Sequence, residues 1–98
     1  MLTVHKYPLP AHDCLVHMPL GAKVIHADIQ GEQICLWAHV DTKQKKELRR
    51  FMIVGTGHTM PEGQKLEHRG TVLMHEGTLV VHVFENVDYT EHQRGVTN

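Results

Sequence analysis

The chain has 98 residues, of which 41% are hydrophobic and 21% charged, and its formal net charge is −1. This length suits one domain with a single modest core, and the near-neutral charge gives no overall attraction to nucleic acid or anionic lipid. No apolar run approaches the ~20 residues that span a bilayer, and the N-terminus lacks the features of a signal peptide. We therefore expect one domain over residues 1–98, with an ordered core at about 3–86 and a polar tail at 87–98.

Three residue types stand out in the composition. The two cysteines, Cys14 and Cys35, are too few for a disulfide scaffold and suit a reducing cytoplasm. Ten histidines are an unusually high number, which is compatible with a metal site, a pH switch or half-exposed positions on strands. Serine is absent from the chain, which excludes every mechanism with a serine nucleophile.

Apolar residues recur with a period of two along most of the chain, which predicts strands rather than helices. Turn residues separate these segments about every 8–12 residues, a spacing typical of small sandwiches and barrels. The sequence therefore predicts an all-β domain, a single small antiparallel β-sandwich or barrel of about seven short strands. The predicted strands are Thr3–Tyr7, Asp13–Met18, Lys23–Ile29, Gln33–Asp41, Arg49–Gly55, Glu67–His75 and Leu79–Glu85.

The third and fourth predicted strands form a hairpin. If Gly31 takes the first central position of a type II′ turn, Ile29 faces Ile34 and the same register continues along both strands. One face is then wholly apolar and is predicted to be core; it carries Ile25, Ala27, Ile29, Ile34, Leu36 and Ala38. The opposite face is mixed and carries Val24, His26, Asp28, Cys35, Trp37, His39 and Asp41.

The last two predicted strands form a second hairpin through Gly77. Its core face carries Val72, Met74, Val81 and Val83, and its other face carries Thr71, Leu73, His75, Val80, His82 and Phe84. In both hairpins the second face is too apolar for plain solvent surface and too polar for plain core. Such faces are typical of ligand grooves and subunit interfaces, so we predict a homo-oligomer.

The strand histidines support an alternative, a small cupin-like metalloprotein or enzyme. His26 and His39 share a predicted face with Asp28, and His75 and His82 share a face of the second hairpin. However, the chain has neither the His-x-His spacing usual in such sites nor a tight zinc spacing. We therefore predict no bound metal, no cofactor and no catalytic residues, and keep the metalloenzyme as the alternative.

The segment Gly55-Thr56-Gly57-His58 ends the fifth predicted strand. It lacks the lysine and the following helix of a phosphate-binding loop. Its two glycines either expose backbone N–H groups to a polar ligand or bend the strand as it leaves the sheet. The local sequence is compatible with both interpretations, a loop that binds a polar ligand and a bend at the end of a strand.

A short basic run covers residues 43–50 and reads most simply as a solvated loop between strands. With Trp37 as a stacking platform, it also supports a third hypothesis, a barrel that binds single-stranded nucleic acid. The near-neutral net charge makes nucleic acid an unlikely partner.

Several short segments lie within residues 4–85: HKYPLP, MPLGAKVIHADIQ, CLWAHVD, RRFMIVGTGHTMP and GTVLMHEGTLVVHVFE. Together they resemble an uncharacterised family of small bacteriophage and prophage proteins, a domain of unknown function. The resemblance implies a phage or prophage origin and hence a bacterial host cytoplasm. It implies no reaction and no catalytic residues, but Gly55 to His58 is one of its characteristic segments.

We therefore expect a phage-encoded accessory binding protein without catalytic activity. Its expected partner is a host or phage protein, or a small-molecule or nucleotide ligand, with counter-defence as one role; no membrane is involved. The predicted ligand-binding residues, which we expect to lie near one another, are Trp37, His39, Gly55, Thr56, Gly57, His58, His82 and Phe84.

Overall fold

The computed structural model of the chain describes residues 1–90, so most of the predicted polar tail, residues 91–98, lies outside the described residues. The prediction of an all-β domain with seven strands is confirmed. No helix among residues 1–90 is long and apolar enough to cross a membrane. The strands are β1 (Leu2–Pro8), β2 (Asp13–Pro19), β3 (Lys23–Gln30), β4 (Gln33–Asp41), β5 (Lys46–Gly55), β6 (Leu66–Met74) and β7 (Leu79–Asn86), with a 3-10 turn η1 (His75–Gly77) between the last two.

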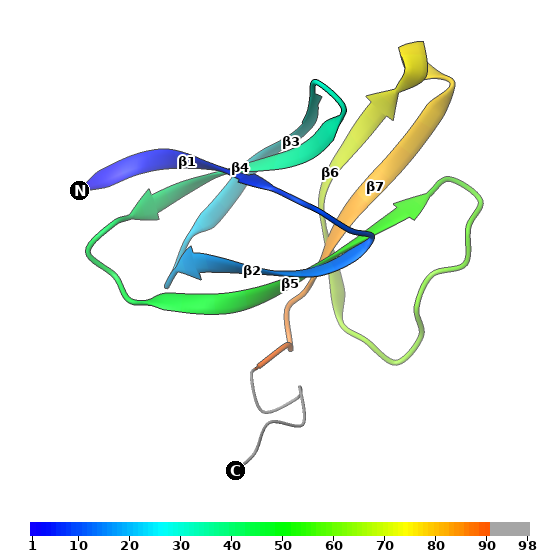
Figure 1. Cartoon of the computed structure of the whole chain (residues 1–98). Coiled ribbons are helices and arrows are strands. Elements are labelled where there is room, and N and C mark those ends of the chain that lie inside the picture. Colours follow the sequence, from blue (N-terminus) through cyan, green and yellow to red (C-terminus); the bar gives the residue numbers. More distant parts are fainter. Residues whose placement is uncertain (91–98) are drawn as a thin grey trace.

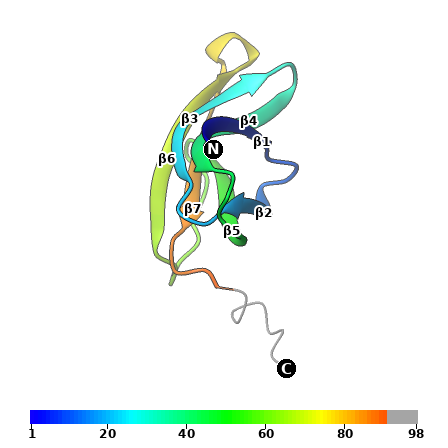
Figure 2. The same ribbon diagram turned by 90° about the vertical axis from the view of Figure 1, so that its left-hand side faces the viewer.

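The strands form two antiparallel sheets, one with the order β1-β4-β3 and one with the order β2-β5-β7-β6 (Figures 1 and 2). The sheets are not closed into a barrel, so the sandwich describes the fold. They approach closely where β3 meets β6: a Cβ built on Gly70 would lie only 2.5 Å from the Cβ of Ala27. Glycine at position 70 therefore allows the two inner faces to touch.

The core lies between the two inner faces. Alternate residues of β4, β5 and β7 point into it, as expected for strands with one buried face. Its largest fully buried side chains are Phe51, Met18, Leu36, Val40, Val72, Val83 and Cys35.

The register predicted for the first hairpin is confirmed at its turn. Ile29 faces Ile34, and Gly31 has a φ of +63°, as the first central position of a type II′ turn requires. The assignment of Ile25 to the core is wrong, because the register shifts between Val24 and His26. This β-bulge turns Val24 to the core side and leaves Ile25 55% exposed.

The structure corrects one strand end, at His75, and adds detail on two other residues. Cys35, assigned to the mixed face, is fully buried, and its thiol approaches the carbonyl oxygen of Gln33. His75 is not part of a strand but begins the turn after β6, where its φ is +50°. Asn86 is buried at the end of β7, and the chain continues in order beyond it, since the amide of Val87 donates to the carbonyl of Lys65.

The strand β5 begins at Lys46, earlier than the predicted Arg49, so five of the eight residues of the basic run belong to the sheet. Arg49 points between the sheets, where its guanidinium donates two hydrogen bonds to the buried carboxylate of Glu85. Arg69 donates a third at 3.0 Å. Burial alone would raise the pKa of Glu85, but the hydrogen bonds and charges of the two arginines lower it below its usual value.

Candidate ligand-binding site at the Gly55–His58 turn

The segment after β5 is a tight turn. The amide of His58 donates to the carbonyl of Gly55 at 3.0 Å, and Gly57, the third residue, has a φ of +85°. A type II turn requires a positive φ at this position, which explains why a glycine is present there. The turn therefore reverses the chain at once and carries His58 back toward the sheet.

Gly55 has a different role from Gly57. It pairs with Val81 on β7 and faces the core side of the sheet, in phase with Phe51 and Ile53. A Cβ at position 55 would lie 2.9 Å from both Cε1 and Nδ1 of His58. The imidazole of His58 therefore fills the space that a side chain at position 55 would occupy.

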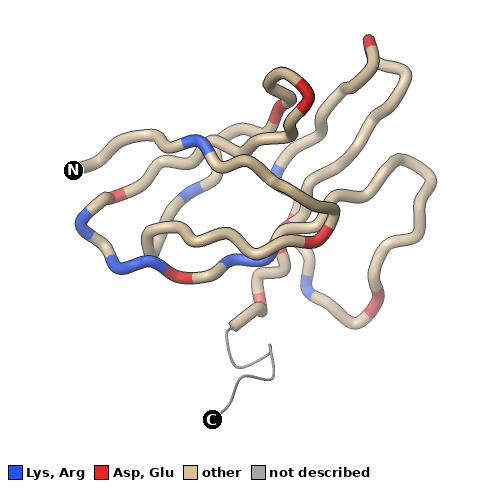
Figure 3. Tube along the Cα trace, viewed as in Figure 1, with Lys and Arg blue, Asp and Glu red and all other residues tan. Residues whose placement is uncertain are grey.

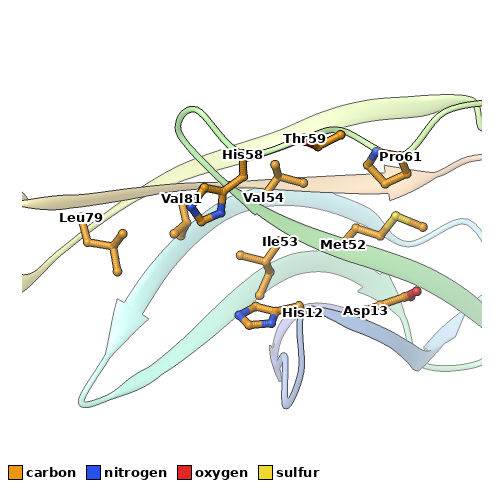
Figure 4. Close-up of a pocket in the computed structure, with 11 residues that line it drawn as sticks. His12, Asp13, Met52, Ile53, Val54, His58, Thr59, Pro61, Leu79 and Val81 are labelled. Carbon is orange, nitrogen blue, oxygen red and sulfur yellow. The ribbon is translucent and has the colours of Figure 1, made fainter.

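Beside His58 lies an open cavity of about 400 Å³. Figure 4 shows the imidazole of His58 next to Val81, and His12 across Ile53 from it. His12 is held there because its carbonyl accepts the amide of Ile53 at 2.8 Å. The remaining lining is mainly apolar: Met52, Val54, Gly55, Thr59, Pro61 and Leu79, with Asp13 at the margin.

The polar groups of this cavity differ in how well they are satisfied. Both carboxylate oxygens of Asp13 accept hydrogen bonds from Arg50, at 2.9 and 2.6 Å, and these bonds lower the pKa of Asp13. By contrast, the imidazoles of His12 and His58 make no hydrogen bond within residues 1–90. The cavity thus combines apolar walls, a neutralised carboxylate and two imidazoles that are available to a ligand.

The other side of the turn is anchored to the outer face of the four-stranded sheet. The imidazole of His82 lies between two threonine hydroxyls, with Nε2 2.9 Å from Oγ1 of Thr56 and Nδ1 3.0 Å from Oγ1 of Thr71. Nε2 of His68 extends this chain to Thr71 at 2.9 Å, and its ring meets Phe84 edge-on at 5.5 Å between centroids. The amide of Thr56 also donates to the carbonyl of Val80. These contacts fix the turn from the side opposite to His58.

Residues 1–94 match the family described as a domain of unknown function, DUF7352. The chain belongs to this family. No curated protein and no solved structure matches the chain. Membership of DUF7352 supplies no reaction and no site residues, so the chemistry of the site has to be argued from its own geometry.

The predicted binding residues of this DUF7352 chain do not share one surface. Trp37 lies between the buried residues Leu36 and Ala38 and therefore points to the outer face of the three-stranded sheet, where its ring meets His26 at 5.7 Å. His39 is on that same face. Since the inner faces of the two sheets pack together, this outer face is remote from the turn. Of the predicted residues, the structure brings together Gly55, Thr56, Gly57, His58 and His82, with Phe84 beside His68.

The histidines proposed as metal ligands are distributed over separate parts of the molecule. His26 lies beside Trp37, 3.5 Å from the carboxylate of Asp28, whereas His75 lies in the β6–β7 turn and His82 between its two threonines. Residues 1–90 contain no group of three or more His, Cys, Asp or Glu side chains that could hold a metal ion.

The basic residues of the run 43–50 also fall into two groups, arginines that form ion pairs and lysines that are exposed. Arg49 is committed to Glu85 and Arg50 to Asp13, so both arginines are neutralised within the domain. The exposed lysines 43, 45 and 46 remain on the β4–β5 connection and the start of β5 (Figure 3). The arginines are therefore not free to form a nucleic-acid surface with these lysines.

Sequence reasoning missed several residues of the cavity, above all His12, Met52 and Leu79. His12 precedes β2 in the β1–β2 connection and reaches the cavity only because β2 pairs with β5. Its position next to Asp13 offered no signal, since the pairing of strands so distant in sequence is not visible in a periodicity of two.

Proposed function

We propose that this DUF7352 protein is a non-catalytic binding protein, and that its ligand is a small, mainly apolar molecule held beside the Gly55–His58 turn. One observation carries the proposal: His12 and His58 direct two hydrogen-bonding groups without partners at an apolar cavity of about 400 Å³. This is the usual composition of a ligand site, where apolar walls supply affinity and a few polar groups fix orientation. A nucleotide is less well supported, because no Lys or Arg lines the cavity.

The proposal also covers the origin, the cellular compartment and the assembly of the protein. We propose a phage or prophage origin and a bacterial host cytoplasm, on the strength of the sequence resemblance, with interference in host defence as one role of the binding activity. We also propose a homo-oligomer. The support for it is the exposure of Leu2, Val4 and Ile25, at 67%, 48% and 55%, on strands β1 and β3 of the three-stranded sheet.

The ligand proposal is tested by titrating isotope-labelled protein with 1-hexanol and following amide chemical shifts. We expect saturable shifts around residues 12–13, 52–59 and 79–81. His58→Ala should weaken binding about tenfold, since it removes a hydrogen-bonding group and its contacts. The matched control is His17→Ala, an exposed histidine on β2 outside the cavity, which should leave binding unchanged. Absence of saturable shifts, or equal binding by both variants, would contradict the proposal.

Assembly is tested separately by light scattering. One chain has a mass of 11.2 kDa, and we expect at least twice that value. Ile25→Lys should reduce the mass to that of one chain, because it places a charge in the exposed apolar surface. A mass of one chain for the unaltered protein would refute the oligomer without affecting the ligand site.

A further inference from the structure

A second cavity of about 390 Å³ adjoins the first. The two share His12 and Ile53. The second is lined further by residues 9–11 of the β1–β2 connection, by the β3–β4 turn and by Met74. Because they share these two residues, the two cavities meet and form one continuous groove, with His12 at the junction.

The groove has a defined charge pattern. Its charged lining residues are Asp13 and Glu32, and neither Lys nor Arg lines either cavity. Asp13 is neutralised by its two hydrogen bonds from Arg50. Glu32, exposed in the β3–β4 turn, forms no hydrogen bond or ion pair within the described part of the chain. One end of the groove thus carries a single uncompensated negative charge.

A neutral acceptor lies next to Glu32. The side-chain amide of Gln33 donates to the carbonyl of Leu9 at 2.6 Å, and this bond fixes the orientation of the amide group. Its oxygen receives no hydrogen bond within residues 1–90, so it is free to accept one. A carboxylate and an amide oxygen at the same end of a groove favour a ligand group that is cationic and rich in donors.

We propose that the groove binds an elongated amphipathic amine, with its ammonium group at Glu32 and Gln33 and its apolar chain extending past His12 toward His58. This inference rests on the proposed function and adds the chemical class and the orientation of the ligand. An anionic head group is disfavoured by the same pattern, because it would face Glu32 and neither Lys nor Arg lines the groove.

The proposal is tested with three probes that share one chain and differ in head group: hexylamine, 1-hexanol and hexanoate, at about pH 8, where imidazole is ordinarily neutral. We expect hexylamine to bind about two- to fivefold more tightly than 1-hexanol, the range of an exposed ion pair, and hexanoate to bind most weakly. Amide shifts on hexylamine binding should extend to residues 32 and 33.

Two matched variants decide the role of the carboxylate. Glu32→Gln should abolish the preference for hexylamine over 1-hexanol. Glu62→Gln, an exposed glutamate in the β5–β6 connection that lines neither cavity, should retain it. Two results would overturn the head-group inference: equal binding of hexylamine and 1-hexanol, or a preference unchanged by Glu32→Gln. Neither result would contradict the proposed ligand site beside the Gly55–His58 turn. Failure of all three probes to bind overturns the proposed function as well.

Discussion

The two ends of β5 use polar residues in opposite ways. In its first half, Arg49 and Arg50 each meet a carboxylate within the domain, with Glu85 and Asp13 as their partners. At its end, the turn after Gly55 brings His58 to an apolar cavity where its imidazole has no partner within residues 1–90. Satisfied polar groups hold a fold together, whereas polar groups left without a partner beside a cavity are available for binding. The contrast predicts that substitutions at the start affect stability and that substitutions at the end affect binding.

The largest effect should come from Glu85→Gln. This change leaves the guanidinium of Arg49, whose side chain is only 13% exposed, without its counter-charge, and breaking a buried pair costs about 3–5 kcal/mol of unfolding free energy. Urea denaturation measures the loss. Glu62→Gln, on an exposed loop, should change the same quantity by less than about 0.5 kcal/mol. A similar small loss in both variants would show that the ion pair contributes little.

Acid should produce the next largest effect. The pKa values of Glu85 and Asp13 are lowered in the folded state, so both groups stabilise the fold when ionised. This stabilisation is present above their unfolded pKa, near 4, and is lost as the pH falls toward the folded values. We expect unfolding free energies to fall between about pH 5 and pH 3. The fall should be smaller in Glu85→Gln; an equal fall in both proteins would exclude Glu85 as a cause.

His82→Ala tests the anchor of the turn. The two threonine hydroxyls would turn to water, so the cost should be only about 1 kcal/mol. The variant should also show a local effect on hydrogen exchange. The amide of Thr56, which donates to the carbonyl of Val80, should exchange its hydrogen faster than in the wild-type protein. His17→Ala serves as the control. Unchanged exchange at Thr56 would mean that His82 does not hold the turn.

The smallest effect on stability should come from Gly55→Ala. The added methyl group would meet the ring of His58, which is exposed and free to swing away, and alanine also restricts the unfolded chain. We therefore expect less than about 1 kcal/mol of change, together with loss of the nuclear Overhauser contact between His58 and Val81 and weaker binding of 1-hexanol. Retained contact and binding would show that position 55 tolerates a side chain beneath the ring.

The period of two and the turn residues were sufficient to predict the strands and the turn at Gly31, because both depend on local chemistry. It could not predict the bulge at Ile25, which lies two residues before the place where Ala27 meets Gly70 on the other sheet. A bulge inserts one residue without changing the composition of the strand, so a pattern of alternation cannot reveal it.

The same limit applies to the site. The turn at Gly55 to His58 was visible in the sequence, and so was His82, which the structure places between Thr56 and Thr71. His12 was not associated with the turn, because only the pairing of β2 with β5 brings it there. Trp37 was grouped with the turn because it lies on the mixed face of the first hairpin, and the sequence does not tell which outer face belongs to which sheet.

The most direct test of the central claim is an isotope-filtered Overhauser measurement on labelled protein with unlabelled 1-hexanol. The account predicts contacts from the hexyl chain to the methyl groups of Val54, Leu79 and Val81 and to the ring of His58. It predicts none to the methyl groups of Leu2 and Val4 on the three-stranded sheet. Contacts confined to Leu2 and Val4 would place the bound hexanol on the three-stranded sheet and contradict the assignment of the turn as the ligand site.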